Sequence, residues 1–280
     1  MKAMAPSSST LIVTSADHPD YTGRALDDLK EGFRAWRLSL ALARLDLRNR
    51  YRGSVLGPFW FTLSSAVMVA GLGLLYSQLF KINLTDYLPH LAVSLIVWQM
   101  ISGLITDAVA CMTGVEGVIR QVRLPYTVHA LRCTLRNALT ALHQIPLIVL
   151  VFVVLGHNPG WSALLVIPGI AILCVNGFAS CIFLGMVCAR FRDVGHIIGN
   201  VLQLAFFLTP IMWKPDMLGD IKVWLPLNPF YALLETLRGP LVEGGGAPLA
   251  WLAALVFTSA NCAIAFMFFA RFRSRIAFWV

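Results

Sequence analysis

LDLRNRYRGSVLGPFWFTLSSAVMVAGLGLL, residues 45–75, places Arg48, Arg50 and Arg52 directly before a long run without a charged residue, which ends only at Lys81. A soluble protein has little reason to put its densest positive charge directly against a long apolar run. A hydrocarbon core about 30 Å thick needs roughly 20 apolar residues in a helix. Basic residues beside such a helix hold that end in the cytoplasm. The stretch therefore predicts a membrane-spanning helix with a fixed direction.

The composition of the whole chain agrees with a membrane protein. Of its 280 residues, 58% are hydrophobic and 13% are charged, whereas soluble globular chains are about 25% charged. The net charge of +8 does not indicate nucleic-acid binding, because the basic residues lie at the ends of apolar runs and form no basic face. The six cysteines show no C-x-x-C spacing, and His129 with Cys133 lacks further ligands nearby, so we predict neither disulfides nor a metal site.

Apolar segments recur along the chain and predict an all-α integral membrane protein. Six of them qualify or nearly qualify as membrane spans, and none contains a charged residue. Prolines at 146, 168 and 210 predict kinks or breaks inside three of them. The predicted spans are residues 55–80, 88–106, 138–155, 163–188, 196–213 and 249–270.

The distribution of basic residues predicts the orientation. Six spans place both termini on one side, and eighteen of the 22 Lys and Arg residues fall on that side, against four on the other. The side richer in Lys and Arg faces the cytoplasm. Both termini are therefore predicted to be cytoplasmic, and the first span would act as an uncleaved anchor.

Three regions follow from these boundaries. Residues 1–22 are predicted to be a disordered cytoplasmic tail, residues 23–52 an amphipathic helix in the membrane interface, and residues 53–275 the transmembrane domain. The alternative for residues 23–52 is a soluble helix packed on a partner domain. Between the last two spans, residues 214–248 predict short re-entrant or interfacial helices, broken at Asn228–Pro229 and Gly239–Pro240.

Several catalytic and nucleotide-binding motifs are absent from the sequence. It contains no G-x-x-x-x-G-K-[ST], D-x-D, H-E-x-x-H or G-x-S-x-G motif. The predicted spans also lack the mid-membrane ionisable residue that a proton-driven carrier would need. We therefore expect the energy for any transport to come from another chain.

Four segments resemble the ABC-2-type permeases that export polysaccharides, namely the O-antigen (Wzm-type), capsule and teichoic acid exporters. They are RYRGSVLGPFW (50–60), RQVRLPYTVHALR (120–132), FRDVGHIIGNVLQLAFFLTPIMW (191–213) and LNPFYALLETLRGPL (227–241). The resemblance covers about residues 35–275. It implies a homodimer in the bacterial inner membrane, two copies of a separate ATPase that binds ATP and Mg, no cofactor in this chain, and a lipid-linked polysaccharide as cargo.

The same resemblance implies a coupling helix at about residues 113–124 that docks on the ATPase. The implied ATPase contacts are Glu116, Arg120 and Arg123 in that segment and Arg190, Arg192 and Asp193 in a second cytoplasmic loop. The alternative is that these charges are only solvated loop ends.

Aromatic and uncharged polar residues in the spans are candidates for a sugar channel, because the C–H-rich faces of sugars stack on aromatic rings. The candidate channel residues are Phe59, Trp60, Phe61, Trp98, Gln99, Asn200, Gln203, Phe206 and Phe207. The alternative is that the aromatics serve packing or the interfacial belts. The resemblance further implies a lipid diphosphate at the inner end of the first span, bound by Arg48, Arg50, Tyr51 and Arg52. Otherwise these arginines serve topology alone.

Two other functions remain open from the residues alone. One is an ABC-2-type exporter of drugs or small lipids. The other is a membrane-embedded glycosyltransferase or acyltransferase, for which His143 is the candidate catalytic residue within a span.

Overall fold

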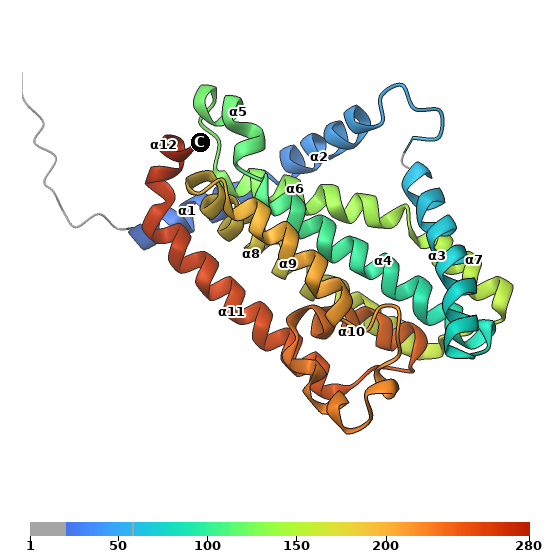
Figure 1. Ribbon diagram of the computed structural model, residues 1–280. Coiled ribbons are helices and arrows are strands. Elements are labelled where there is room, and N and C mark those ends of the chain that lie inside the picture. The colour runs from blue at the N-terminus through green and yellow to red at the C-terminus, as the bar shows by residue number, and fades with distance from the viewer. Residues whose placement is uncertain (1–20, 58) are drawn as a thin grey trace, which may run out of the picture.

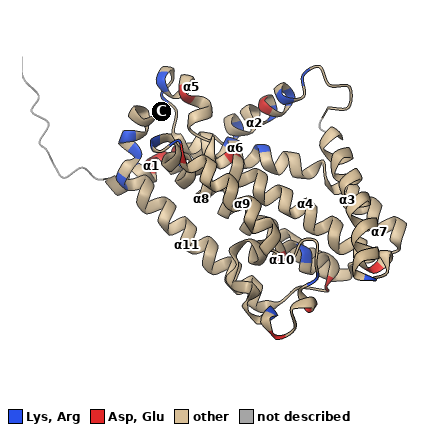
Figure 2. Ribbon diagram, in the orientation of Figure 1, with Lys and Arg blue, Asp and Glu red and all other residues tan. Residues whose placement is uncertain are grey.

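The computed structural model describes residues 21–57 and 59–280, and these residues form helices and loops without a strand. The predicted tail, residues 1–22, lies outside the described residues except for its last two, which begin the first helix. Figure 1 shows long helices running side by side, with shorter helices at both ends of the bundle. Figure 2 shows the charged residues mainly at those ends, while the long helices between them carry almost none.

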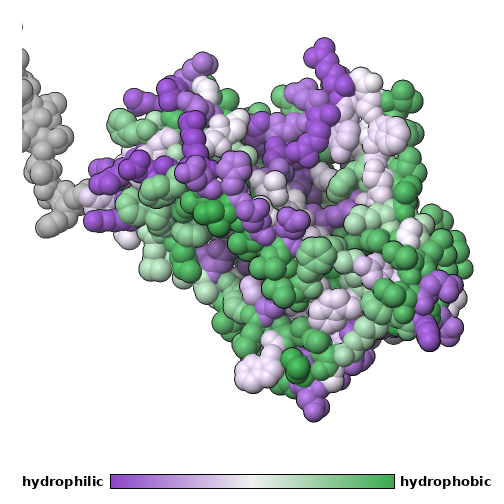
Figure 3. Space-filling model, in the orientation of Figure 1, coloured by the Kyte–Doolittle hydropathy of each residue, from purple (hydrophilic) through white to green (hydrophobic). Residues whose placement is uncertain are grey.

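Five helical segments among the described residues are long and apolar enough to cross a membrane. They include α3 (Phe59–Phe80), α4 (Leu84–Val109), α6 (Tyr126–Leu142) followed by α7 (Ile145–Leu155), the 3₁₀ turn η2 (Gly160–Leu165) followed by α8 (Val166–Arg190), and α11 (Pro248–Phe272). In Figure 3 hydrophobic side chains cover much of the middle of the molecule, and hydrophilic ones crowd the upper end. This confirms an all-α membrane protein.

The helix α9 (Val194–Leu208), predicted as the fifth span, is shorter than the others. Its 15 residues extend about 22 Å at 1.5 Å per residue, which is less than the roughly 30 Å of a hydrocarbon core. The helix ends before Thr209 and Pro210, where the backbone becomes extended. The predicted span of residues 196–213 is therefore shortened at its C-terminal end.

The third span begins twelve residues earlier than predicted, and this corrects the expected boundary. The sequence suggested residues 138–155, with Arg132 and Arg136 in a cytoplasmic connection. Instead α6 starts at Tyr126 and contains both arginines. The helix can hold them because each forms an ion pair with an acidic residue of a neighbouring helix.

Proline divides this span as predicted. The chain turns at His143 and Gln144, and α7 starts with Pro146 in its first turn, where the missing N–H costs no helical hydrogen bond. Gly156 then ends α7 in the left-handed conformation, with φ of 66°. The two halves, α6 and α7, form one interrupted crossing.

The N-terminal segment 23–52 consists of two helices rather than one. The first, α1 (Tyr21–Arg34), and the second, α2 (Trp36–Arg50), meet at Ala35, and both pack on α6. Their buried positions are small or acidic residues such as Ala25, Asp28 and Ala43. Five of its large apolar residues stay exposed, namely Leu26, Phe33, Trp36, Leu38 and Leu45, while the other leucines are half-buried. An exposed apolar face is what a helix in the membrane interface needs, and that role stays a prediction.

The connection between α9 and α11 folds back into the protein. It contains η3 (Pro215–Leu227) and α10 (Pro229–Val242), whose residues from Tyr231 to Pro240 are buried. Asn228 begins α10, and its side-chain oxygen accepts hydrogen bonds from the backbone N–H groups of Phe230 and Tyr231.

The predicted break at Gly239–Pro240 is wrong, because α10 continues to Val242. Pro240 cannot donate to the carbonyl of Thr236, four residues earlier. Gly169 of α8 lies against that carbonyl, and a Cβ built on Gly169 would lie 2.5 Å from its oxygen. The close contact between α8 and α10 therefore covers the carbonyl that proline leaves without a helical partner.

The N-terminal and C-terminal helices meet at the same end of the bundle. Asp28 of α1 accepts a 2.7 Å hydrogen bond from Nε of Arg273, which follows α11 in the turn η4 (Arg273–Arg275). The short helix α5 (Glu116–Gln121) lies nearby, and its Arg120 donates to the carbonyl of Val280, just after α12 (Ile276–Trp279). Figure 1 shows α1, α5 and α12 together at this end.

Candidate functional site

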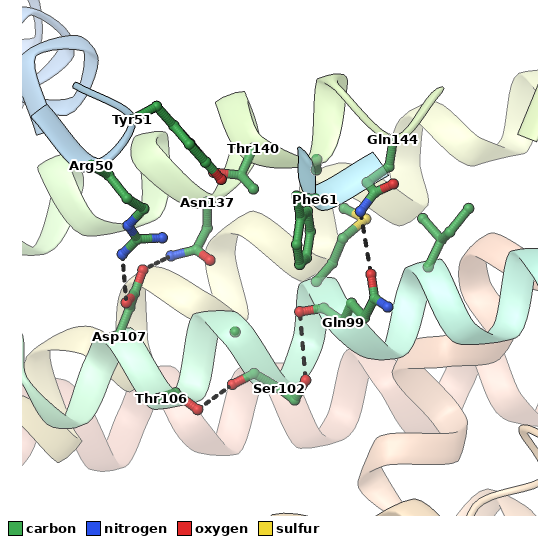
Figure 4. Close-up of a pocket in the computed structure, with 14 residues that line it drawn as sticks. Arg50, Tyr51, Phe61, Gln99, Ser102, Thr106, Asp107, Asn137, Thr140 and Gln144 are labelled. Atoms are coloured by element: carbon green, nitrogen blue, oxygen red, sulfur yellow. Dashed lines mark hydrogen bonds and ion pairs between the residues drawn. The ribbon is translucent and has the colours of Figure 1, made fainter. Parts of the chain in front are cut away.

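A cavity of about 420 Å³ opens where the end of α2 and the start of α3 meet α4 and α6. Figure 4 shows the labelled side chains converging on it from these helices. Its lining residues are Arg50, Tyr51, Phe61, Ile96, Gln99, Met100, Ser102, Gly103, Thr106, Asp107, Asn137, Thr140, Ala141 and Gln144. Most of these are polar, although the surrounding helices are apolar.

Helical periodicity explains why α4 and α6 supply most of the wall. On α4 the lining positions from Ile96 to Asp107 recur at spacings of three and four residues. On α6 the positions Asn137, Thr140 and Ala141 do the same, and Gln144 follows in the turn before α7. Side chains three and four residues apart lie on one face of a helix. Two polar faces thus point toward each other.

One end of the cavity holds uncharged polar groups. Ser65 donates to Oε1 of Gln99 over 2.9 Å, and the amide of Gln144 donates to the Ser65 hydroxyl over 3.0 Å and to the same oxygen of Gln99 over 3.3 Å. The remaining Oε1 of Gln144 is buried without a hydrogen-bond partner. Buried polar atoms are rarely left unpaired. This acceptor is therefore available to a hydroxyl or amide from a ligand.

The other end is charged. Asp107 accepts a 2.7 Å hydrogen bond from Asn137, lies 2.9 Å from Nη2 of Arg136 and lies 3.8 Å from Nη2 of Arg50. The Arg50 side chain is 48% exposed, so it keeps donors free for an anion. Arginine is suited to phosphate oxygens because its planar guanidinium binds two of them at once.

A second carboxylate supports this charged end from outside the cavity. Asp46 of α2 forms ion pairs with Arg132 and with Arg136, the latter at 3.1 Å. Burial alone would raise the pKa of Asp46, but hydrogen bonds and charge from the two arginines together hold it below its ordinary value. Asp46 therefore stays ionised and fixes α2, and with it Arg50, against α6.

The structure brings together only part of the predicted channel. Phe61 and Gln99 line the cavity. Trp98 is instead buried in the core, with its ring 5.8 Å from that of Phe206 and 5.7 Å from that of Phe230. Within one chain Trp98 and Phe206 thus pack against neighbouring aromatic rings, and their place in a channel stays a prediction.

The remaining predicted channel residues lie on the outer surface of the chain. Phe59 and Trp60 are about half exposed at the start of α3, and Phe207 is 59% exposed on α9. Asn200 and Gln203 are exposed on α9 as well. None of these five lines the 420 Å³ cavity, so within one chain they form separate outward-facing surfaces.

Of the four residues predicted to bind a lipid diphosphate, two line the cavity and two do not. Arg50 and Tyr51 line the cavity, whereas Arg48 and Arg52 are exposed and are not part of its wall. Only two of the four predicted residues therefore belong to the cavity. In the structure Arg50 is joined to Asp107 across it (Figure 4).

The residues predicted to contact an ATPase lie at one exposed end of the bundle. Glu116 and Arg120 form an ion pair at 2.8 Å within the projecting helix α5, and Arg123 is exposed just after it. A hollow of about 280 Å³ is lined by Glu116 and Arg192 together with Val109, Thr113 and Cys188. Arg190 and Asp193 are exposed next to Arg192. The two predicted segments are therefore adjacent in space.

Sequence reasoning missed most of the polar wall. Asp107, Asn137 and Gln144 were not among the candidate site residues, although they interrupt or border apolar segments. That interruption was the available signal, because an acid or amide in a membrane helix is costly unless it is paired or functional. Their partners lie on other helices, namely α2, α3, α4 and α6, and could not be read from the sequence.

His143, the candidate catalytic residue, is held in the turn between α6 and α7. Its Nδ1 is 2.8 Å from the carbonyl of Leu139, and its own carbonyl accepts a 2.6 Å hydrogen bond from Thr62. The ring packs edge-on against Phe59 at 5.9 Å. These contacts give His143 a structural role at the interruption of the span.

A second polar cluster lies at the opposite end of the bundle, around the buried Arg238 of α10. Its guanidinium forms an ion pair with the buried Glu235, and Nη1 donates to the carbonyl of Pro210 over 2.6 Å. Its Nε lies 3.5 Å from Glu243, and the buried His90 of α4 lies 3.9 Å from the same carboxylate. These contacts tie α10 to the end of α9 and to α4.

Comparisons of the sequence with known proteins show that the chain is similar to transporters. The sequence model described as "ABC-2 type transporter" matches residues 37–242. An O-antigen export system permease protein, RfbA, from Myxococcus xanthus is 25% identical over 209 residues, which are 74% of this chain and 80% of that protein. Two proteins with the same name from Klebsiella pneumoniae are 25% and 24% identical over the same length, each covered to 81%.

Proposed function

Since this chain belongs to the ABC-2 type transporter family, we propose that it is the permease subunit of an ATP-driven exporter of lipid-linked polysaccharide, acting in the bacterial inner membrane. Its relatives named as O-antigen export permeases support a polysaccharide of the O-antigen kind as cargo. Family membership also removes the alternative of a transferase built on His143, because the family consists of transporters.

The observation that carries this proposal is the make-up of the 420 Å³ cavity. It joins an aromatic ring, Phe61, and the uncharged amides of Gln99 and Gln144 to a guanidinium, Arg50, at its rim. Sugars present hydroxyls and C–H-rich faces, which suit amides and aromatic rings. A lipid diphosphate presents oxygens that suit arginine. The two ends of the cavity match the two parts of a lipid-linked glycan.

Six crossings with both termini in the cytoplasm are the topology that best fits the contacts. The ion pair between Asp28 and Arg273 supports the two ends of the chain on one side. The bond from Arg120 to the carbonyl of Val280 supports the connection between α4 and α6 on that side as well. Five long segments alone would put them on opposite sides. The short helix α9 supplies the sixth crossing, and the basic residues at this end support a cytoplasmic side.

A homodimer is supported by the surfaces that one chain leaves open. Asn200 and Gln203 are exposed on the apolar helix α9, and bare amides facing lipid would be costly. A second copy, or a water-filled path between two copies, would satisfy them. Phe59, Trp60 and Phe207 would then join the path from α3 and α9, and the two chains together would complete the channel.

A separate ATPase, in two copies for a dimer, would supply the energy. The sequence contains no P-loop motif, and α5 projects with the hollow between Glu116 and Arg192 beside it. Binding of ATP and Mg by the partner would move α5. Because α5 follows α4 through η1 (Thr113–Val115), that movement would reach the wall of the cavity.

The experiment is to delete the gene in its host and restore it with single variants. Gln99→Leu and Gln144→Leu should lower surface polysaccharide by at least about tenfold, because each removes hydrogen bonds inside the cavity. Gln78→Leu, exposed on α3 away from the cavity, is the matched control and should restore wild-type levels. Membrane levels of each variant are measured by immunoblot.

Two results would refute the proposal. One is wild-type surface polysaccharide in the deletion strain. The other is a deletion phenotype limited to sensitivity toward drugs or small lipids, which would favour the alternative cargo. Lipid-linked glycan accumulating inside the deletion strain would support the proposal directly.

A further inference from the structure

Three cysteines far apart in the sequence meet where α4, α6 and α8 pack together. Cys111 follows the end of α4, Cys133 lies in α6 and Cys181 lies in α8, and all three are buried. Their sulfur atoms all lie within 4.8 Å of one another. The spacing of the cysteines along the chain gave no sign of this cluster, and His129, which shares metal-ligand spacing with Cys133, is not part of it.

Close helix packing holds the cluster in place. A Cβ built on Gly185 of α8 would lie 3.2 Å from Cβ of Cys111, and one built on Gly177 would lie 2.4 Å from side-chain atoms of Leu104 on α4. The two glycines therefore let α4 and α8 approach closely on both sides of Cys181. Around it, Oγ1 of Thr134 is 4.0 Å from Sγ of Cys181, and Nη2 of Arg136 is 3.7 Å from Sγ of Cys133.

We propose that Cys111, Cys133 and Cys181 form a binding site for a soft metal ion, Cu(I) in particular. Metal–thiolate bonds of about 2.3 Å in a trigonal site put the sulfurs about 4 Å apart, so each needs to move by well under 1 Å. Soft thiolate ligands select Cu(I) and zinc among the metals available to proteins. Structural zinc takes four ligands, whereas Cu(I) is satisfied by three sulfurs in a sealed apolar site.

The site has a cation next to one of its three sulfurs. Each thiol that binds the ion releases its proton, so the bound cluster carries negative charge. The guanidinium of Arg136 lies beside Cys133, and it offsets only a small part of that charge because it also pairs with Asp46 and Asp107. The alternative is that the three cysteines act only as small buried hydrophobes, as free cysteine often does, and the two possibilities differ in whether metal binds.

Occupation of the site would also affect the proposed transport cycle, and this consequence rests on the proposed function. Cys111 lies two residues before η1, which leads into α5. A metal bound there would join the root of α5 to α6 and α8. Cu(I) would therefore restrain the movement of α5 and inhibit ATP-driven export.

The test uses the purified full-length protein in detergent, with ascorbate to keep copper reduced. Competition with the chromogenic chelator bicinchoninate should show one Cu(I) bound per chain. Cys111→Ala, Cys133→Ala and Cys181→Ala should each weaken Cu(I) binding by at least about 100-fold. Removing a residue that only contacts a metal ligand costs about 10- to 100-fold in affinity, and removing a ligand itself should cost at least as much. The triple variant Cys174→Ala, Cys188→Ala and Cys262→Ala removes the other three cysteines and should bind like the wild type.

X-ray absorption of the wild-type protein with copper bound counts the ligands independently and should show three sulfur neighbours. This measurement decides the outcome if an alanine variant fails to elute as the wild type does on size exclusion. The proposal is overturned if the wild type binds no Cu(I), if the copper has fewer than three sulfur neighbours, or if the control triple variant loses it. None of these readouts depends on transport, so failure of the proposed function would leave them unchanged.

Discussion

Replacing Arg238 with methionine should destabilise the protein strongly, because it leaves a buried carboxylate without its partner. Arg238 is fully buried, and the side chain of Glu235, its ion-pair partner, is 1% exposed. The same guanidinium reaches the carbonyl of Pro210 and lies 3.5 Å from Glu243. Methionine keeps much of the side-chain length and removes all of these charged contacts.

The expected magnitude follows from the burial of the pair. Removing one partner of a buried ion pair costs about 3–5 kcal/mol of unfolding free energy, because the other charge stays buried and uncompensated. Glu235→Gln should cost less, about 1.5–3 kcal/mol, since Arg238 keeps Pro210 and Glu243. The double variant removes both charges together, so its cost should fall well below the sum of the two single costs.

The assay is equilibrium unfolding of the purified protein in mixed micelles, followed by tryptophan fluorescence as the denaturing detergent increases. Wild type, the two single variants and the double variant form a double-mutant cycle whose coupling free energy isolates the pair. Lys222→Met is the matched control. Its only ion pair among the described residues, with Asp216, is solvent-exposed, and such pairs contribute about 1 kcal/mol or less.

Additive free-energy changes would refute this reasoning. If the double variant lost the sum of the single losses to within about 0.5 kcal/mol, the residues would not be coupled. An Arg238→Met protein as stable as the Lys222→Met control would likewise show that Arg238 does not hold α10 in place. A coupling of at least about 2 kcal/mol would support the ion pair as described.

Three further changes test other parts of the structure. Burial and the charge of Glu235 raise the pKa of Glu243 from 4.5 to about 7. The folded protein then binds more protons than the unfolded chain, so stability falls as pH rises from about 4.5 to 7. Glu243→Gln should remove this loss, so the variant should be about 1–2 kcal/mol more stable than the wild type at pH 8. This free-energy difference allows for solvent screening, because the Glu243 side chain is partly exposed. The same unfolding assay, repeated across pH, measures it, and an unchanged pH profile would contradict it. Gly169→Ala should lower the free energy of unfolding by about 1–3 kcal/mol, because the added methyl group would clash with the carbonyl of Thr236. Gly117→Ala, with open space around it, should lower it by less than about 0.5 kcal/mol. Equal stabilities of the two alanine variants would contradict this contact. Asp46→Asn should lower export by releasing α2, as measured by surface polysaccharide, and normal export would show that α2 needs no such anchor.

The candidate site was only partly predictable. Phe61 and Gln99 were chosen from residue type and position, and Arg50 and Tyr51 from the family resemblance, and all four line one cavity. Trp98 was chosen on the same grounds and lies in the core. Residue type indicates what a side chain can bind, whereas its direction depends on how α4 is rotated against its neighbours. That rotation is set by contacts between helices, so it cannot be predicted from the residues of α4 alone.

By itself the sequence determined the class of the protein and its long apolar helices, because the length of an apolar run and the positions of its charges act locally. It placed the break before Pro146, which follows from the missing proline N–H. Only the tertiary structure decided where charged residues could enter the bundle. Arg132 and Arg136 lie inside α6 because Asp46 and Asp107, on two other helices, neutralise them there. The three-cysteine cluster likewise exists only because α4, α6 and α8 pack together, and pairings between distant residues are a property of the packed chain.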